Sequence, residues 1–317
     1  MAMTSTVAAA ADWRLLAVQQ WCGGIPMTAE MLAGIGLWKA WSIPWLLVIL
    51  AVLAWYIMAA RGDFQPSPQG ARKKAPFGKI ASFTLGVILF YLAVGSPLHI
   101  IGHFFMFSIH MLTMAVLYFI VPPLILYGLT EEMYASLLRR EPVRKLYEFF
   151  SRHTALSLVT FNLMLSVYHI PPIFDLLKSN SWAGTLIHGL LFLAAMLNWL
   201  PVSPAGPMAK HHSEGKKIVY LFVDALALTP ACVFVIFSDR AMYEAYRNAP
   251  QLVSWLTALT DQQLGGIIML LTQHLVYMVV LVILVFQWFY RDQQISPEPN
   301  NLVMFSNVKG QARRQMR

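Results

Sequence analysis

Residues 95–128 read GSPLHIIGHFFMFSIHMLTMAVLYFIVPPLILYG. From His103 to Gly128 the stretch contains no Asp, Glu, Lys or Arg. A helix rises 1.5 Å per residue, so this run would be about 39 Å long, more than the roughly 30 Å of a bilayer's hydrocarbon core. The stretch therefore predicts a membrane-spanning helix, which the Gly95-Ser96-Pro97 break separates from the apolar run before it.

Apolar runs of similar length recur along the chain. The composition, 58% hydrophobic and 12% charged, is far from that of a soluble globular protein. We therefore expect an all-α polytopic membrane bundle, in which Pro122-Pro123 and Pro171-Pro172 kink or end their helices. The seven predicted spans are residues 42–60, 79–99, 103–128, 155–174, 182–202, 217–238 and 263–290.

Basic residues are distributed unequally between the two sides of these spans. With the N-terminus outside, 18 of the 23 Lys and Arg residues fall on the inner side, which the positive-inside rule assigns to the cytoplasm. The sequence thus predicts a plasma-membrane protein with N-out/C-in topology. Its parts are an outer interfacial segment (1–41), a seven-helix domain (42–290) and a basic cytoplasmic tail (291–317). The net charge of +8 reflects this topology, so no nucleic-acid partner is inferred.

Five of the nine histidines fall in one layer when they are placed by helical rise from the outer helix ends. A single intramembrane imidazole often only bridges two helices. Three imidazoles from three different helices at one depth favour a shared metal or cofactor site. His274 is expected near the midplane, away from this layer. The layer comprises His99, His103, His110, His169 and His188.

Imidazole and thioether ligands together suit copper, especially Cu(I). His103, Met106, His110 and Met114 have the spacing of one helical stripe, and Met111 follows His110. Methionine is also a common filler of helix interfaces, so this stripe alone is weak evidence. Cys232 and Met269 are further candidate ligands at a similar depth. The usual zinc, protease and nucleotide motifs are missing.

Two acidic residues lie within or beside predicted spans. Asp224 is expected to pair with a lysine or arginine near the inner face. Asp261 is expected to cap its own helix, with a histidine-orienting role as the alternative. The following Gly265-Gly266 pair predicts a close approach between two helices.

Several segments resemble the multi-spanning CtaG family of bacterial cytochrome c oxidase assembly factors, of the Gram-positive type. They are residues 95–128 quoted above, YHIPPIFDLL (168–177), LIHGLLFLAAMLNWLPV (186–202) and DQQLGG (261–266). The resemblance implies a role in building the copper centre of the oxidase catalytic subunit, and it assigns the family's motif histidines to His110, His169 and His188. Thr113-Met114 stands where many members have Gln-His, which changes the expected ligand set.

We therefore expect a non-enzymatic assembly factor that binds copper near the outer face. His110, His169 and His188 would form the primary site, with His99 and His103 as an entry pair and Met111 and Met114 as further ligands. The expected partner is an oxidase subunit or another assembly factor. Two other classes would use similar histidines: a membrane zinc hydrolase, which needs a general base such as Asp261, and a haem-binding membrane protein.

Overall fold

The computed structural model describes residues 40–62, 74–204, 206 and 212–295, and within these ranges it contains helices but no strands. The predicted N-terminal segment, apart from its last two residues, and most of the basic tail lie outside the described residues. The elements are α4 (Ile43–Ala60), α5 (Phe77–Gly95), α6 (Pro97–Phe104), α7 (Phe107–Ala115), the π-helical η1 (Val116–Ile120), α8 (Val121–Gly128), α9 (Glu131–Leu137), α10 (Glu141–Arg152), α11 (Thr154–Tyr168), α12 (Pro171–Ser179), α13 (Ser181–Trp199), the 3-10 turn η2 (Leu200–Val202), α14 (Glu214–Ala227), α15 (Thr229–Ile236), α16 (Glu244–Arg247) and α17 (Ala258–Ile295).

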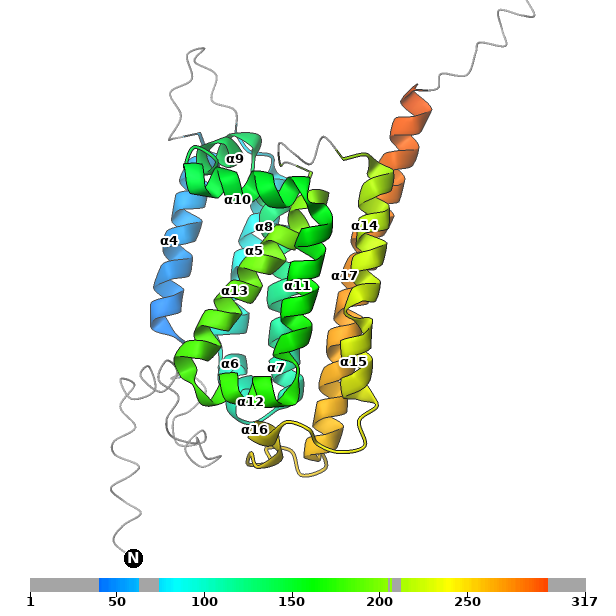
Figure 1. Cartoon of the computed structure of the whole chain (residues 1–317). Helices are drawn as coiled ribbons and strands as arrows, with labels where there is room; N and C mark the ends of the chain where they lie inside the picture. Colours follow the sequence, from blue (N-terminus) through cyan, green and yellow to red (C-terminus); the bar gives the residue numbers. More distant parts are fainter. Residues whose placement is uncertain (1–39, 63–73, 205, 207–211, 296–317) are drawn as a thin grey trace, which may run out of the picture.

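Six helical segments in the described part of the chain are long and apolar enough to cross a membrane, and α11 with α12 makes a possible seventh. The predicted all-α membrane bundle is confirmed. The fourth span, predicted over residues 155–174, bends by 79° between α11 and α12, which confirms the kink predicted at Pro171-Pro172. Proline disfavours helical geometry in the residue before it, and Ile170, which precedes Pro171, is extended with ψ 122°. The chain therefore turns at this point, and α12 lies across the end of the bundle (Figure 1).

The Pro122-Pro123 pair does not end the third span. The helix passes from α7 through η1 into α8 and continues to Gly128. Pro122 has no N–H to donate to the carbonyl of Tyr118, four residues earlier. Trp199 Nε1 on α13 donates to that carbonyl instead, at 3.2 Å. The side chain of a neighbouring helix thus satisfies the backbone group that the proline leaves free.

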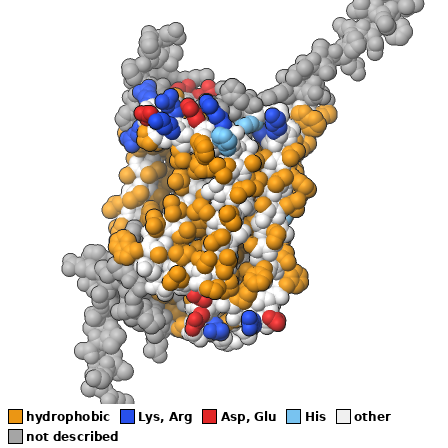
Figure 2. Space-filling model, in the orientation of Figure 1, with side chains coloured by type: hydrophobic (Ala, Val, Ile, Leu, Met, Phe, Trp, Pro, Cys, Tyr) orange, Lys and Arg blue, Asp and Glu red, His pale blue; other side chains and the backbone are white. Residues whose placement is uncertain are grey.

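Hydrophobic side chains cover the middle of the visible face between two charged ends (Figure 2). We call the end with α6, α12 and α16 the histidine end, and the end with α9 and α10 the basic end (Figure 1). Exposed apolar side chains are normal in a protein that faces lipid rather than water. The N-out/C-in orientation remains a prediction from the sequence, which assigns the histidine end to the outer face.

Gly265 and Gly266 let α17 approach its neighbours closely. A Cβ atom added to Gly265 would lie 2.6 Å from Phe107 Cδ1 on α7, and one added to Gly266 would lie 2.8 Å from Ile236 Cγ1 on α15. Any larger side chain would push these helices apart. The close approach predicted from the glycine pair is confirmed, and it places α17 directly against the helix that carries His110.

Asp224 differs from the sequence prediction. It is buried at 1% exposure on α14. Its hydrogen-bond partners among the described residues are the neutral side chains of Asn162, Asn198 and Tyr277, rather than a lysine or arginine. The expected ion pair is therefore wrong for the described residues. The carboxylate points into the bundle, where several helices meet, and does not reach toward the membrane surface.

Candidate functional site

Asp261 fixes the start of α7, the helix that carries three of the seven predicted ligands: His110, Met111 and Met114. Its carboxylate accepts hydrogen bonds from the backbone N–H groups of Phe107, at 2.6 Å, and Ser108, at 3.2 Å, and from the Ser108 hydroxyl. The first N–H groups of a helix such as α7 have no acceptor within the helix, and negative charge is favoured at this end. Asp261 thus caps a helix more than 150 residues away in sequence, whereas local spacing predicted that it would cap its own.

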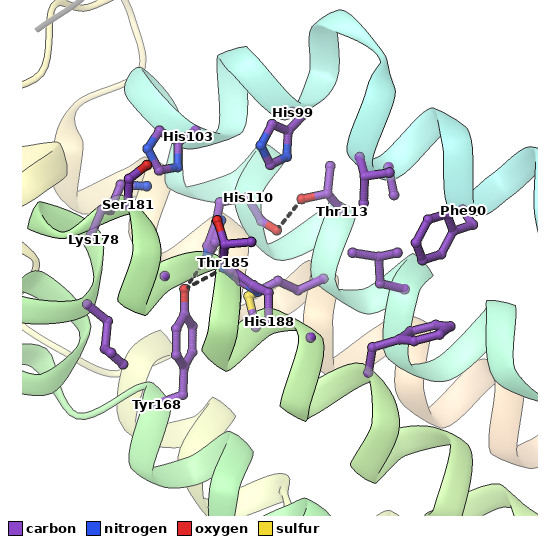
Figure 3. Close-up of a pocket in the computed structure, with 18 of the residues that line it drawn as sticks. Phe90, His99, His103, His110, Thr113, Tyr168, Lys178, Ser181, Thr185 and His188 are labelled. Atoms are coloured by element: carbon purple, nitrogen blue, oxygen red, sulfur yellow. Dashed lines mark hydrogen bonds between the residues drawn. The ribbon is translucent and has the colours of Figure 1, made fainter. Parts of the chain in front are cut away.

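A cavity of about 380 Å³ opens at the histidine end. Its wall contains the imidazoles of His99 and His103 on α6 and of His188 on α13 (Figure 3). His110 and Met114 of α7 complete the predicted ligands in its wall. One side of the wall is apolar, with Trp45, Phe90, Val94, Leu117 and Phe192 among its residues.

The hydroxyl group of Tyr168 joins two of the predicted ligands. It lies 3.2 Å from His110 Nε2 and 3.3 Å from His188 Nε2, and the two imidazole rings are 5.8 Å apart between centroids (Figure 3). Tyr118 holds the other ring nitrogen of His188, with 2.8 Å between its hydroxyl and Nδ1. The sequence analysis assigned no role to either tyrosine, although Tyr168 directly precedes His169.

His169 faces Met111 instead of the cavity. Its Nδ1 lies 2.7 Å from the carbonyl oxygen of Leu165, which can only accept, so Nδ1 carries the proton. In the neutral ring Nε2 then has a free lone pair, and it lies 3.3 Å from Met111 Sδ. Two electron-pair donors thus face each other. With metal bonds of about 2.0 Å to nitrogen and 2.3 Å to sulfur, two ligands of one tetrahedral ion would lie about 3.5 Å apart.

His99 and His103 lie near each other on α6, outside the spans that end at Gly95 and begin at Phe107. Their rings are stacked with centroids 6.0 Å apart. Burial, together with the nearby Lys178 side chain, lowers the pKa of His99 to about 4. Burial and the same lysine also lower the pKa of His103. Both imidazoles are therefore neutral at pH 7 and have a lone pair free for a metal.

Lys178 is a cavity residue that the sequence analysis did not assign to the site. Its Nζ donates to the Tyr246 hydroxyl at 2.5 Å, and that hydroxyl donates to the carbonyl of Gly102 at 2.6 Å. The ammonium also lies 4.2 Å from the centre of the Tyr246 ring. These two hydrogen bonds connect α12 to α16 and α16 to α6. Gly102 in turn needs to be small, because an added Cβ would lie 2.8 Å from the backbone nitrogen of His110.

The seven predicted ligands thus fall into two adjacent groups. His99, His103, His110, His188 and Met114 line the cavity, and His169 pairs with Met111 beside it. Within the described residues, no three His, Cys, Asp or Glu side chains form a ready metal site. The three-histidine site remains a prediction, and it would require a ring movement. Cys232, Met269 and His274 are absent from the cavity wall.

Replacing Asp261 by alanine should lower the stability of the bundle by about 2 kcal/mol, the upper range for losing a helix cap. The backbone donors of Phe107 and Ser108 would lose their buried acceptor. The thermal unfolding midpoint in detergent measures this change. Asp239→Ala, at an exposed position in the loop after α15, is the control. Equal midpoints for the two variants would contradict the capping role.

A comparison with protein-family models gives one match, to the cytochrome c oxidase caa3 assembly factors, over residues 56–291. The match covers well over half of the chain. The chain belongs to the Caa3_CtaG family. This confirms the resemblance noted in the sequence, and all seven predicted ligands lie inside the matched region. Searches of curated proteins and of solved structures gave no match.

As a member of the Caa3_CtaG family, the chain is a cytochrome c oxidase assembly factor. An assembly factor must interact with oxidase components, directly or through other proteins. In this family member the polar side chains of the cavity wall are four histidines, one tyrosine, one lysine and the hydroxyl residues Thr113, Ser181 and Thr185.

Proposed function

We propose that this Caa3_CtaG protein binds Cu(I) at the histidine end and passes it to an oxidase subunit or to another assembly factor. The observation that carries the proposal is the pairing of His169 Nε2 with Met111 Sδ at 3.3 Å, beside the two histidines that converge on Tyr168. Imidazole and thioether donors suit Cu(I), whereas Mg²⁺ and Ca²⁺ require oxygen ligands.

The arrangement of His169 supports metal binding in a second way. Histidines that ligate metals usually donate their other ring N–H to a carbonyl or a carboxylate, which fixes the tautomer. The bond from His169 Nδ1 to the Leu165 carbonyl has this form. It leaves Nε2 as the only ring atom that can bind a cation, and Nε2 already points at a soft sulfur.

Tyr168 makes the His110–His188 pair suitable for a copper ion that is passed on rather than for a permanent cofactor. In the metal-free state its hydroxyl is hydrogen-bonded to both His110 Nε2 and His188 Nε2. A copper ion bound to either nitrogen would have to displace that hydroxyl. A competing internal partner lowers the affinity, and a carrier needs an exchangeable site more than a closed cage.

The zinc hydrolase alternative is weaker for this chain. It requires a general base beside the metal, and Asp261 was the candidate. That carboxylate is buried at 5% exposure, caps α7 and is absent from the cavity wall. The same wall contains no Asp or Glu in the described part of the chain. The haem alternative is tested by the absorption spectrum, because a bound haem gives a Soret band.

Metal analysis of the purified protein tests the proposal. We expect about one copper per chain after reconstitution with Cu(I), and a reduced copper content in His110→Ala and His188→Ala. In cells, deletion of the gene should lower the copper content of the oxidase. A protein that stays copper-free when copper is abundant would overturn binding. Normal oxidase copper in the deletion strain would overturn delivery.

A further inference from the structure

Asp224 lies at the centre of a polar cluster outside the histidine site. It receives hydrogen bonds from three other helices: Asn162 Nδ2 on α11 at 2.6 Å, Asn198 Nδ2 on α13 at 2.6 Å, and the Tyr277 hydroxyl on α17 at 2.7 Å. Tyr220 supports Asn198 by donating to its side-chain oxygen at 2.7 Å. All of these donors are neutral.

The negative charge of this carboxylate lacks a compensating cation. In the described part of the chain, no lysine, arginine or histidine forms a salt bridge with Asp224. A charge buried within a membrane domain is costly unless a partner balances it, and such residues commonly mark ion or proton sites. The three donors favour the ionised form, since each one points a hydrogen atom at the carboxylate.

Two further oxygens in this region have no donor. Asn162 Oδ1 and Gln273 Oε1 are both buried, and neither has a hydrogen-bond partner among the described residues. Asn162 Oδ1 belongs to the amide group whose Nδ2 donates to Asp224. Gln273 lies one turn from Tyr277 on the same face of α17, and its Nε2 donates to the carbonyl of Ala225, next to Asp224.

The cluster therefore has a surplus of oxygen acceptors. A carboxylate offers about four lone-pair positions, and the hydrogen bonds from Asn162, Asn198 and Tyr277 fill three of them. The helix is interrupted only at Leu228, between α14 and α15, and the two form one span.

We propose that Asp224, Asn162 Oδ1 and Gln273 Oε1 bind a monovalent alkali cation such as Na⁺. Oxygen ligands suit hard cations, and one carboxylate balances one positive charge, whereas a divalent ion would leave an excess. A cation here would join α11, α14 and α17, so binding should stabilise the bundle. The site is separate from the histidine end, and the inference does not depend on copper transfer.

Thermal unfolding of the purified full chain in detergent tests this site. At constant ionic strength and pH, replacing choline chloride by sodium chloride should raise the unfolding midpoint by about 5 °C or more. Asp224→Asn should abolish this shift. Gln273→Leu retains the three hydrogen bonds to Asp224 but loses the one from Gln273 Nε2 to the Ala225 carbonyl, so its own midpoint in choline is the baseline. Relative to that baseline, it should weaken the apparent sodium affinity at least about tenfold.

Gln263→Leu provides the matched control on α17. Gln263 Nε2 donates to the Ser238 carbonyl at 3.0 Å, so the variant also loses one side-chain hydrogen bond, but far from Asp224. Its sodium shift should equal that of the unmodified protein. Equal midpoints in sodium, potassium, lithium and choline would overturn the proposal. A midpoint that responds to pH but not to sodium would also overturn it, and would identify a proton as the occupant.

Discussion

Replacing His169 by alanine is expected to weaken Cu(I) binding by more than about 100-fold. Loss of a residue that only orients a ligand typically costs 10–100-fold in metal affinity, and loss of a ligand should cost more. The variant would remove the imidazole that faces Met111 Sδ at 3.3 Å and leave the sulfur without its partner. A competition titration with a chromophoric Cu(I) chelator measures the change directly.

His274→Ala is the matched control for this experiment. Its Nδ1 lies 2.8 Å from the Leu270 carbonyl, the same bond one helical turn back that His169 makes with Leu165. His274 lies on α17 and is absent from the cavity wall. The control therefore removes an equivalent imidazole and an equivalent hydrogen bond, and it should leave copper affinity unchanged. Equal losses in both variants would show a general packing effect and contradict the role of His169.

The same two variants separate binding from delivery in cells. If copper passes through this site, the oxidase from a His169→Ala strain should contain less copper than the oxidase from a His274→Ala strain. Protein levels in the membrane must be matched first. Normal oxidase copper with a protein that no longer binds copper would mean that the assembly role is independent of the histidines.

The sequence predicted features that depend on length, composition and depth. Apolar runs placed the spans, because an entire helix must be apolar to cross lipid. Helical rise alone grouped His110 and His188, which lie together in the cavity. Gly265-Gly266 predicted a close helix approach, since small residues are what such contacts need.

Features that depend on the rotation and pairing of helices were not predictable in this way. Asp261 caps α7 because tertiary packing brings the two helix ends together, and local spacing contains no information about that contact. Asp224 was predicted to form an ion pair with a nearby basic residue, but its hydrogen-bond partners come from three distant helices. The Tyr168 hydroxyl lies between two histidines only because α11 turns that face toward α7 and α13.

Substituting phenylalanine at the two tyrosines should change copper affinity in opposite directions. Tyr168→Phe removes a hydroxyl that occupies both His110 Nε2 and His188 Nε2, while its ring can still pack on Phe174 at 5.3 Å. These two hydrogen bonds compete with copper for the ring nitrogens and contribute about 1 kcal/mol each. Because the variant loses both, Cu(I) binding should tighten by about tenfold or more.

Tyr118→Phe removes the group that holds His188 Nδ1 at 2.8 Å, and with it the orientation of that ring. Loss of such an orienting partner should weaken Cu(I) binding by about 10–100-fold. The two variants delete the same atom from the same residue type, so general effects of losing a buried hydroxyl cancel in the comparison. Weaker binding in both would mean that the Tyr168 hydroxyl supports the metal instead of competing with it. The site would then be a fixed cage around copper rather than an exchangeable one.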